Sequence, residues 1–90
     1  GKRVVRIHNG HPMMTYVTGL GCTASATIAA FAAVDGDPFS AAVGALAYVG
    51  ICGEIAAQSA SAPGSFAVQF LDALFAMTPE TLKNRCQIET

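Results

Sequence analysis

Residues 16–22, Tyr16-Val17-Thr18-Gly19-Leu20-Gly21-Cys22, decide the fold of this chain. Three β-prone residues lead into a glycine turn, and an unbroken run of small and apolar residues follows. This order predicts a strand that ends in a tight turn and opens onto a helix. Several backbone N–H groups and the positive end of the helix dipole would then converge on one point, which favours an anion. Cys22 would lie at the edge of that point, where the same field favours thiolate over thiol.

Two helices are predicted downstream of the turn. The first runs from about Gly21 to Val34 and is apolar nearly all round, so we expect it to be buried between other elements. The sequence Asp35-Gly36-Asp37-Pro38 ends it. Asp37 is a suitable N-cap with Pro38 at the first helical position, so a second helix is expected from there to about Ser59.

The last third of the chain predicts further helices. Residues 59–65 form a loop of Ser, Ala, Pro and Gly, and large apolar residues from Phe66 to Phe75 then recur at helical spacing. A fourth short helix is expected from Pro79 to Arg85, and we interpret residues 87–90 as a terminus.

Upstream of the glycine turn the pattern favours strands. Residues 3–7 and 13–17 are two β-prone runs, and His8-Asn9-Gly10-His11-Pro12 lies between them. Because Asn-Gly tolerates the positive φ values of a tight reversal, this segment predicts a hairpin. We interpret the two histidines as loop residues or strand-end partners, since no further residue completes a metal site.

The second helix carries many small residues and one carboxylate. Gly44, Gly50 and Gly53 indicate close packing against another backbone. Glu54 is expected to be a partnered structural carboxylate, with a catalytic role as the alternative. The segment is nearly long and apolar enough to span a membrane, but Glu54 lies inside it and no Lys or Arg flanks it, so we expect no membrane.

Composition and charge restrict the class of protein. The 90 residues are 52% hydrophobic and 12% charged, against roughly 25% charged in an average soluble domain. Such a small domain leaves much of its surface in water, so we expect this chain to be a segment or subunit of something larger. No Lys or Arg occurs between Ile7 and Leu82, which excludes the basic stripe that nucleic-acid binding needs.

The three cysteines, Cys22, Cys52 and Cys86, are widely spaced and odd in number. They predict neither a disulfide framework nor a zinc site, and no metal ligand is assigned in this chain. Reduced thiols are typical of the cytosol, and no charged-then-apolar start suggests a secretory signal, so a cytoplasmic location is expected.

The glycine turn alone is a weak motif. The chain lacks the GxxxxGK[ST] of a P-loop and the GxGxxG of a dinucleotide site. A strand-to-helix turn with a buried cysteine explains the same residues without any ligand.

A succession of motifs around the turn resembles the C-terminal part of the hydroxyethylthiazole kinase family. The resemblance covers nearly the whole chain, and four motifs in this order and spacing are far more specific than any one alone. The first three motifs are Asn9-Gly10-His11-Pro12, Val17 to Cys22 and Gly50 to Ala57, and the fourth consists of Gly64-Ser65-Phe66 together with Leu71 to Leu74.

This resemblance implies an α/β ribokinase-like fold, in which helices flank a mostly parallel central sheet. Residues 1–90 would be the C-terminal segment of a single kinase domain, a hairpin or strand pair followed by three to four helices, with the upstream part of the domain absent. Family members phosphorylate the hydroxyl of 4-methyl-5-(2-hydroxyethyl)thiazole in thiamine salvage, using ATP and Mg²⁺, and are homotrimers. The expected partners are therefore the thiazole alcohol, ATP, the remainder of the fold and further copies of the chain.

The resemblance also implies roles for the turn residues. Thr18 matches the residue that approaches the ATP phosphates, and Gly19 matches one that borders the thiazole. Gly19, Leu20, Gly21 and Cys22 correspond to the anion hole. Cys22 matches the substrate-side catalytic base. Leu20 departs from the family, which usually has a small residue or threonine there, and its bulk would narrow the pocket.

Two other interpretations remain open on sequence grounds. The chain could belong to another ribokinase-like small-molecule kinase, of pyrimidine or pyridoxal type. Alternatively, it could be a non-catalytic segment whose apolar helices serve oligomer packing.

Overall fold

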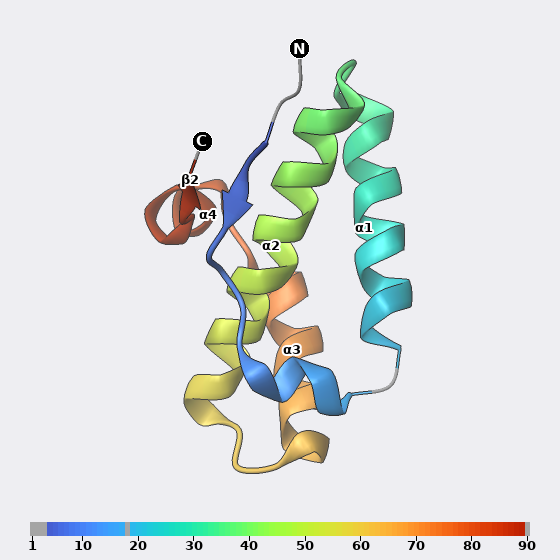
Figure 1. Cartoon of the computed structure of the whole chain (residues 1–90). Helices are drawn as coiled ribbons and strands as arrows, with labels where there is room; N and C mark the ends of the chain where they lie inside the picture. Colours follow the sequence, from blue (N-terminus) through green and yellow to red (C-terminus); the bar gives the residue numbers. More distant parts are fainter. Residues whose placement is uncertain (1–3, 18, 90) are drawn as a thin grey trace.

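The computed structural model describes residues 4–17 and 19–89, with the backbone only at Leu20. Its helices and strands follow one another in a simple order (Figure 1), namely β1 (Arg6–Ile7), the 3₁₀ helix η1 (Pro12–Tyr16), α1 (Leu20–Val34), α2 (Pro38–Ser59), α3 (Pro63–Ala76), α4 (Pro79–Arg85) and β2 (Ile88–Glu89). This part of the chain is mostly helical, and it carries one two-stranded antiparallel sheet.

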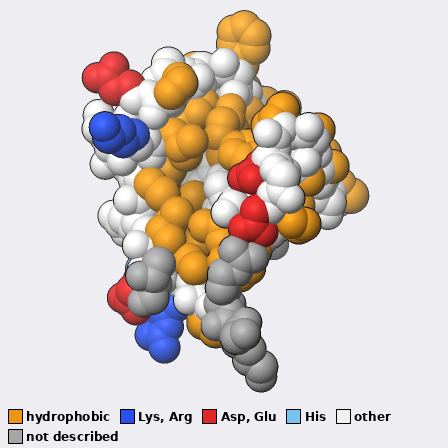
Figure 2. Space-filling view, turned by 90° about the horizontal axis from the view of Figure 1, so that it is seen from above, with side chains coloured by type: hydrophobic (Ala, Val, Ile, Leu, Met, Phe, Trp, Pro, Cys, Tyr) orange, Lys and Arg blue, Asp and Glu red, His pale blue; other side chains and the backbone are white. Residues whose placement is uncertain are grey.

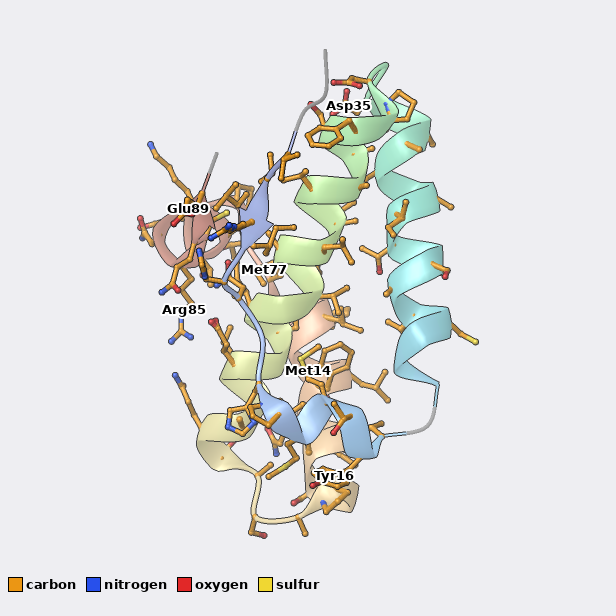
Figure 3. The ribbon with its side chains drawn as sticks, in the orientation of Figure 1. Met14, Tyr16, Asp35, Met77, Arg85 and Glu89 are labelled. Atoms are coloured by element: carbon orange, nitrogen blue, oxygen red, sulfur yellow. The ribbon has the colours of Figure 1, made fainter. Side chains whose placement is uncertain are left out.

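Helix α2 is the centre of the molecule. The helices α1 and α3 pack against it, and β1, η1 and α4 also contact it (Figure 1). The local signals act as expected at its start, where the Asp37 side chain accepts a hydrogen bond from the Phe39 N–H and Pro38 occupies the first turn. Asp35 lies at the turn between α1 and α2 (Figure 3). The predicted bounds of the second helix, 38–59, are confirmed.

The core lies between α2 and α3. Ile51, Cys52 and Phe66 are fully buried, and Phe66 stacks on Phe70 with ring centroids 6.0 Å apart. The remaining buried apolar residues are mostly small and lie mainly on α2, as its composition favours.

The three glycines of α2 all lie at close contacts, but the predicted approach of another backbone is found only at Gly50, since Gly44 and Gly53 meet side chains. A Cβ added at Gly50 would stand 2.7 Å from the carbonyl oxygen of Asn9, and one added at Gly44 would stand 3.0 Å from the Phe31 ring. At Gly53 it would overlap the Met14 side chain. These three glycines therefore allow α1 and the segment before the glycine turn to pack closely on α2.

The predicted hairpin is wrong. Residues 13–16 belong to η1 and not to a strand, and β1 pairs with β2, with Arg6 opposite Glu89 and Ile7 opposite Ile88. Residues 88–89, which we interpreted as part of a plain terminus, therefore supply the strand partner. Pro12 and the cap at His11, whose Nδ1 accepts from the Met13 N–H, favour the helical turn locally.

Two smaller expectations also need correction. Helix α3 begins at Pro63 and not at Phe66, because the Ser65 hydroxyl accepts the N–H groups of Ser61 and Ala62 and so caps an earlier start. The expected burial of the first helix is not found, since none of the described side chains of α1 is buried. By contrast, the ranges predicted for the first and fourth helices are confirmed to within one residue.

Helix α2 is also long and apolar enough to cross a membrane, with a mean hydropathy of 1.6 in its most apolar window. Half of that window is buried against the rest of the molecule. The core helix of a soluble protein has the same composition, so hydropathy alone does not decide between the two.

Candidate functional site

The glycine turn at the start of α1 has the geometry of an open helix N-terminus. Gly19 is the N-cap with φ 93° and ψ −5°, a left-handed conformation that glycine adopts without strain. No side chain caps this end. The N–H groups of Leu20, Gly21 and Cys22 belong to the first turn, where a helix provides no carbonyl partner. Within the described residues, these three amide donors are therefore open to a ligand at this point.

The next residue of the helix holds the turn in place. The Thr23 N–H and hydroxyl both donate to the Gly19 carbonyl oxygen, at 3.0 and 3.2 Å. These two hydrogen bonds hold the Gly19 carbonyl in place. They do not use the N–H groups of the residues that follow Gly19.

Cys22 lies in the first turn of α1, exposed and with a free thiol. The first turn carries no acidic side chain that would compete for the amides. Backbone donors of this kind can bind an anion. The thiol beside them can accept a hydrogen bond from a group next to that anion.

The segment that leads into the turn is anchored on α2. Met14 of η1 reaches toward α2 and packs on Gly53 (Figure 3). The Thr15 hydroxyl donates to the Pro12 carbonyl at 2.8 Å, which closes η1 internally. The backbone is extended at Val17, just before the turn. The position of the turn thus depends on the contact between η1 and α2.

Asn9 joins three parts of the chain, although the sequence indicates for it only a place in a turn and in one of the stretches that resemble the family. Its Nδ2 donates to both carboxylate oxygens of Glu54, at 3.1 and 3.0 Å, and to the Arg85 carbonyl at 2.9 Å. Its Oδ1 accepts the Gln87 N–H at 2.7 Å. Glu54 is confirmed as a partnered carboxylate. No local sequence pattern indicates this role of Asn9, because its hydrogen-bond partners lie 45 to 78 residues away in the sequence.

The histidines occupy surface positions. His11 caps η1, and the His8 Nε2 lies 3.5 Å from the Glu89 carboxylate, beside Arg6. This agrees with their interpretation as loop or strand-end residues. No group of three or more His, Cys, Asp or Glu among the described residues could hold a metal ion.

The second cysteine has a different environment. Cys52 is fully buried on α2, and burial raises the pKa of its thiol to about 11. Burial also raises the pKa of Tyr48, with a smaller effect from the neighbouring Cys52 thiol, and the Tyr48 hydroxyl donates to the Leu74 carbonyl at 2.8 Å. Both groups stay neutral near pH 7 and serve the core.

Most of the site residues predicted from the sequence lie together in the structure. Gly19, Leu20, Gly21 and Cys22 form one turn whose amides belong to a single helix start. Thr18 lies outside the described residues, and so does the side chain of Leu20. The roles that the resemblance implied for these residues stay predictions.

An uncapped helix start with a glycine N-cap and an accessible thiol has a geometry that is able to bind an anion, and helix starts of this kind are common in phosphate-handling enzymes. Comparison with known families specifies the class further. A model of the hydroxyethylthiazole kinase family matches residues 1–80. The chain belongs to that family.

Individual relatives agree with this assignment. The chain is 53% identical over 89 residues to the hydroxyethylthiazole kinase of Desulfotalea psychrophila, covering 99% of this chain and 33% of that one. It is 56% identical over 84 residues to that of Granulibacter bethesdensis, covering 93% and 31%. The solved hydroxyethylthiazole kinase structure from Pyrococcus horikoshii OT3 matches with a TM-score of 0.92 at 35% identity, over 99% of this chain and 35% of that one. The chain thus spans about one third of the length of these relatives.

Proposed function

We propose that this chain provides the anion-binding turn of a hydroxyethylthiazole kinase. The proposed reaction transfers the γ-phosphate of ATP to the hydroxyl of 4-methyl-5-(2-hydroxyethyl)thiazole, as part of thiamine salvage. Membership of the family supports this proposal, and the open glycine turn is the observation in this chain that carries it. Because the chain spans about one third of its relatives, the rest of the ribokinase-like α/β fold would supply the remaining contacts.

The turn has the parts that phosphoryl transfer needs. Negative charge spreads over the transferred oxygens in the transition state, so positioned donors do most of the catalytic work. The amides of Leu20, Gly21 and Cys22 are donors of this kind, and they need no reorganisation because α1 fixes their directions. They would form the anion hole with Gly19.

Cys22 would act on the substrate side. Its exposed thiol stands in the first turn of α1, within the same short stretch as the anion hole. In the proposal its sulfur accepts the hydrogen bond or proton of the thiazole hydroxyl while the hydroxyl oxygen attacks phosphorus. Gly19 would border the thiazole and Thr18 would approach the ATP phosphates. The bulk of the Leu20 side chain would narrow the substrate pocket.

The described residues do not fit a magnesium site, because they contain no suitable cluster of ligands. In the proposed enzyme Mg²⁺ would neutralise phosphate charge, held by groups outside the described residues. We further propose that the enzyme is a homotrimer in the cytoplasm, that it acts on small molecules only, and that it uses neither nucleic acid nor a membrane.

A chimera tests the proposal most directly. This chain would replace the matching 89 residues of the Desulfotalea psychrophila enzyme, with which it is 53% identical. We expect ADP release that depends on added thiazole alcohol and on Mg²⁺. A panel with pyrimidine and pyridoxal substrates distinguishes the nearest alternative kinases, and a folded chimera that turns over none of them would support a purely structural segment.

Substitution of Cys22 tests the assigned base. Cys22→Ala is expected to lower kcat by about 10²- to 10⁴-fold, the usual contribution of a general acid or base, with a much smaller change in KM. Cys86→Ala is the matched control, since Cys86 is also a free, partly accessible thiol but lies at the end of α4. Equal turnover in the two variants would remove Cys22 from the mechanism.

A further inference from the structure

The Asn9 side chain is fixed by its hydrogen bonds. An asparagine amide has two N–H groups and one carbonyl oxygen. The Nδ2 of Asn9 donates to both carboxylate oxygens of Glu54, at 3.1 and 3.0 Å, and to the Arg85 carbonyl at 2.9 Å. Its Oδ1 accepts the Gln87 N–H at 2.7 Å. Each polar atom of this side chain therefore has a partner, and together these partners hold it in one orientation.

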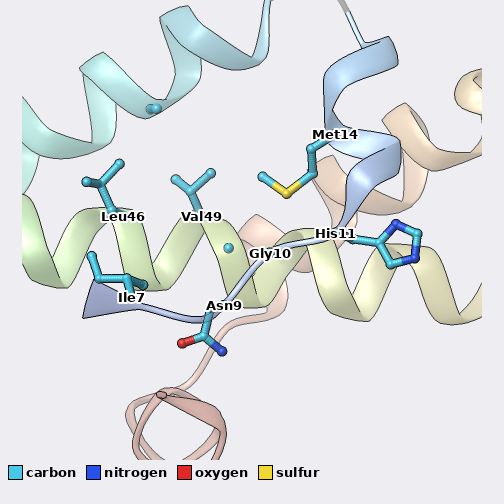
Figure 4. A pocket seen from close by; sticks show the side chains of 9 residues that line it. Ile7, Asn9, Gly10, His11, Met14, Leu46 and Val49 are labelled. Atoms are coloured by element: carbon cyan, nitrogen blue, oxygen red, sulfur yellow. The ribbon is translucent and has the colours of Figure 1, made fainter. Parts of the chain in front are cut away.

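The same side chain is not directed at a small molecule. An apolar groove of about 420 Å³ runs along α2, and Asn9 and Met14 are among the residues that line it. Leu46 and Val49 rise from α2 into this groove, whereas the Asn9 side chain points away from it (Figure 4). We therefore interpret the Asn9 amide as a link between parts of the chain and not as a ligand-binding group.

Glu54 has a strong reason to keep this partner. Its carboxylate is half-buried on α2, and the helices α1, α2 and α3 contain no Lys or Arg. On the face seen from above, hydrophobic side chains fill the middle and the Lys and Arg side chains stand at the margins (Figure 2). Hydrogen bonds to a charged acceptor are about twice as strong as those between neutral groups. Loss of the Asn9 amide would remove these donors from a half-buried carboxylate, which is costly.

Asn9 is held against one turn of α2. Gly50 and Glu54 are four residues apart on that helix and so lie on the same side of it. The Asn9 backbone rests on Gly50, where an added Cβ would stand 2.7 Å from the Asn9 carbonyl oxygen, and the Asn9 side chain binds Glu54. Gly53, in the same turn, is in contact with Met14. Both ends of the segment from Asn9 to Met14 are therefore fixed on residues 50–54.

This segment leads across α2 to the glycine turn. α4 and α1 lie on opposite sides of α2 (Figure 1). Asn9 is bonded to the end of α4, and Gly19 begins α1. Between them Gly10 turns the chain with φ 139°, and His11 caps η1. Because the connection is short and fixed on α2, a shift of Asn9 would also move the amides of the glycine turn.

We propose that Asn9 and Glu54 are positioning residues for the anion hole at the glycine turn. Neither touches the substrate or the transferred phosphate. The pair holds the amides of Leu20, Gly21 and Cys22 where negative charge develops in the transition state. The inference rests on the proposed kinase function. A displacement of about 1 Å far from the reacting atoms can lower a rate about hundredfold, so loss of the pair should appear in catalysis.

The kinetics of the chimera with the Desulfotalea psychrophila enzyme test this role. Asn9→Ala should lower kcat about 10- to 100-fold and change KM for ATP and for the thiazole alcohol less than about threefold, because positioned donors act mainly on the transition state. Asn84→Ala is the matched control, since it removes the same amide from an exposed position of α4, and it should keep the original kcat.

Hydrogen exchange without ATP or thiazole tests the geometry separately from the chemistry. The Thr23 N–H donates to the Gly19 carbonyl, so its exchange shows how firmly the turn is held. In the Asn9→Ala chimera, a peptide covering residues 19–25 should exchange at least about tenfold faster. A peptide covering residues 47–53, in the core of α2, should exchange as before. A general loss of stability would accelerate both peptides by a similar factor.

A swap of the two side chains tests the pair itself. Asn9→Asp places a second carboxylate against Glu54, so kcat should fall at least as far as in Asn9→Ala. Adding Glu54→Gln to Asn9→Asp restores an amide opposite a carboxylate, and kcat should recover at least about fivefold. The recovery is partial because the Arg85 carbonyl does not regain its donor. Circular dichroism confirms that each variant keeps its helices.

Three results would overturn the inference. One is an Asn9→Ala chimera whose kcat matches that of Asn84→Ala, and another is a double variant no faster than Asn9→Asp. The third is equal acceleration of exchange in both peptides, which would show that the pair only stabilises the fold. If Asn9→Ala does not fold, Glu54→Gln takes its place in both experiments. It keeps the size of the side chain and one acceptor oxygen, and kcat should fall at least about threefold.

A chimera without any kinase activity would contradict the proposed function instead. The exchange measurement needs no turnover, so it still decides whether Asn9 holds the glycine turn in place.

Discussion

The helices α1 and α2 have nearly the same composition but very different surroundings. Both consist mainly of alanine, glycine and other apolar residues. Nine residues of α2 are buried, whereas none of the described side chains of α1 is. The reason is position, since α2 contacts elements on several sides and α1 packs substantially only on α2. Apolar composition by itself therefore does not decide whether a helix is buried, because burial depends on the contacts that the rest of the chain makes with it.

This difference in burial gives the two helices different roles, since α2 stabilises the fold and α1 carries the candidate site. Helix α2 holds the core and anchors η1, and α1 presents the glycine turn at its open end. Substitutions on the two helices should therefore have different consequences even where the residues are alike.

The largest contrast is expected between Ile51→Ala and Val34→Ala. Ile51 of α2 is fully buried, so its truncation leaves a cavity and should lower the free energy of unfolding by about 2–5 kcal/mol. Val34 of α1 is 88% exposed, and its truncation should change that free energy by less than about 0.5 kcal/mol. Urea unfolding followed by circular dichroism measures both, and similar losses would mean that α1 is covered in solution.

A smaller contrast is expected between Gly50→Ala and Gly21→Ala. The new methyl group of Gly50→Ala would press on the Asn9 backbone, so we expect a loss of about 1–3 kcal/mol and a displaced N-terminal segment. At Gly21 of α1 an added Cβ meets nothing within 4 Å, so alanine should stabilise the helix by up to about 1 kcal/mol. Thermal unfolding of the two variants gives the sign of each change, and destabilisation by Gly21→Ala would show that α1 is already closely packed there.

A further contrast concerns pH and the two thiols. Burial holds the Cys52 pKa near 11, above the ordinary value of 9.0. Between these values the folded chain keeps a proton that the unfolded chain loses, so stability present below pH 9 should decline as the pH rises from 9 to 11. The decline should be on the order of 2 kcal/mol. Urea unfolding at pH 8, 9.5 and 11 measures it.

Cys52→Ala is the control for this pH dependence, and the variant should lose most of it.

Alkylation at pH 8 compares the accessibility of the thiols on the same two helices. The exposed Cys22 should react readily with iodoacetamide, and Cys52 should react only as fast as the chain opens. Rapid modification of Cys52 in the native chain would contradict the burial described here.

Most of the helical structure could be predicted because its signals are local. Asp37 with Pro38, and Thr78 with Pro79, combine a capping side chain with a proline in the first turn, and each pair begins a helix where expected. The hairpin could not be predicted correctly, since the partner of β1 is more than 80 residues away in the sequence. Local propensity at residues 13–16 was overridden by the proline turn and by the contact of Met14 with Gly53.

The candidate site was partly predictable in the same way. A glycine before a small-residue helix locates an open N-terminus, because the left-handed conformation and the missing cap follow from residue type. The support for that turn could not be foreseen, since it depends on long-range contacts such as Asn9 with Glu54.

The sequence by itself determined four helices, the N-cap at Asp37 with Pro38 at the first helical position, the glycines that needed close neighbours, and the position of the turn from Gly19 to Cys22. These depend on interactions within a few residues of one another. Only the tertiary structure decided that α2 is the core and that residues 6–7 and 88–89 pair as β1 and β2. Such choices depend on contacts between distant segments, whose free energy is gained only when the whole chain has packed.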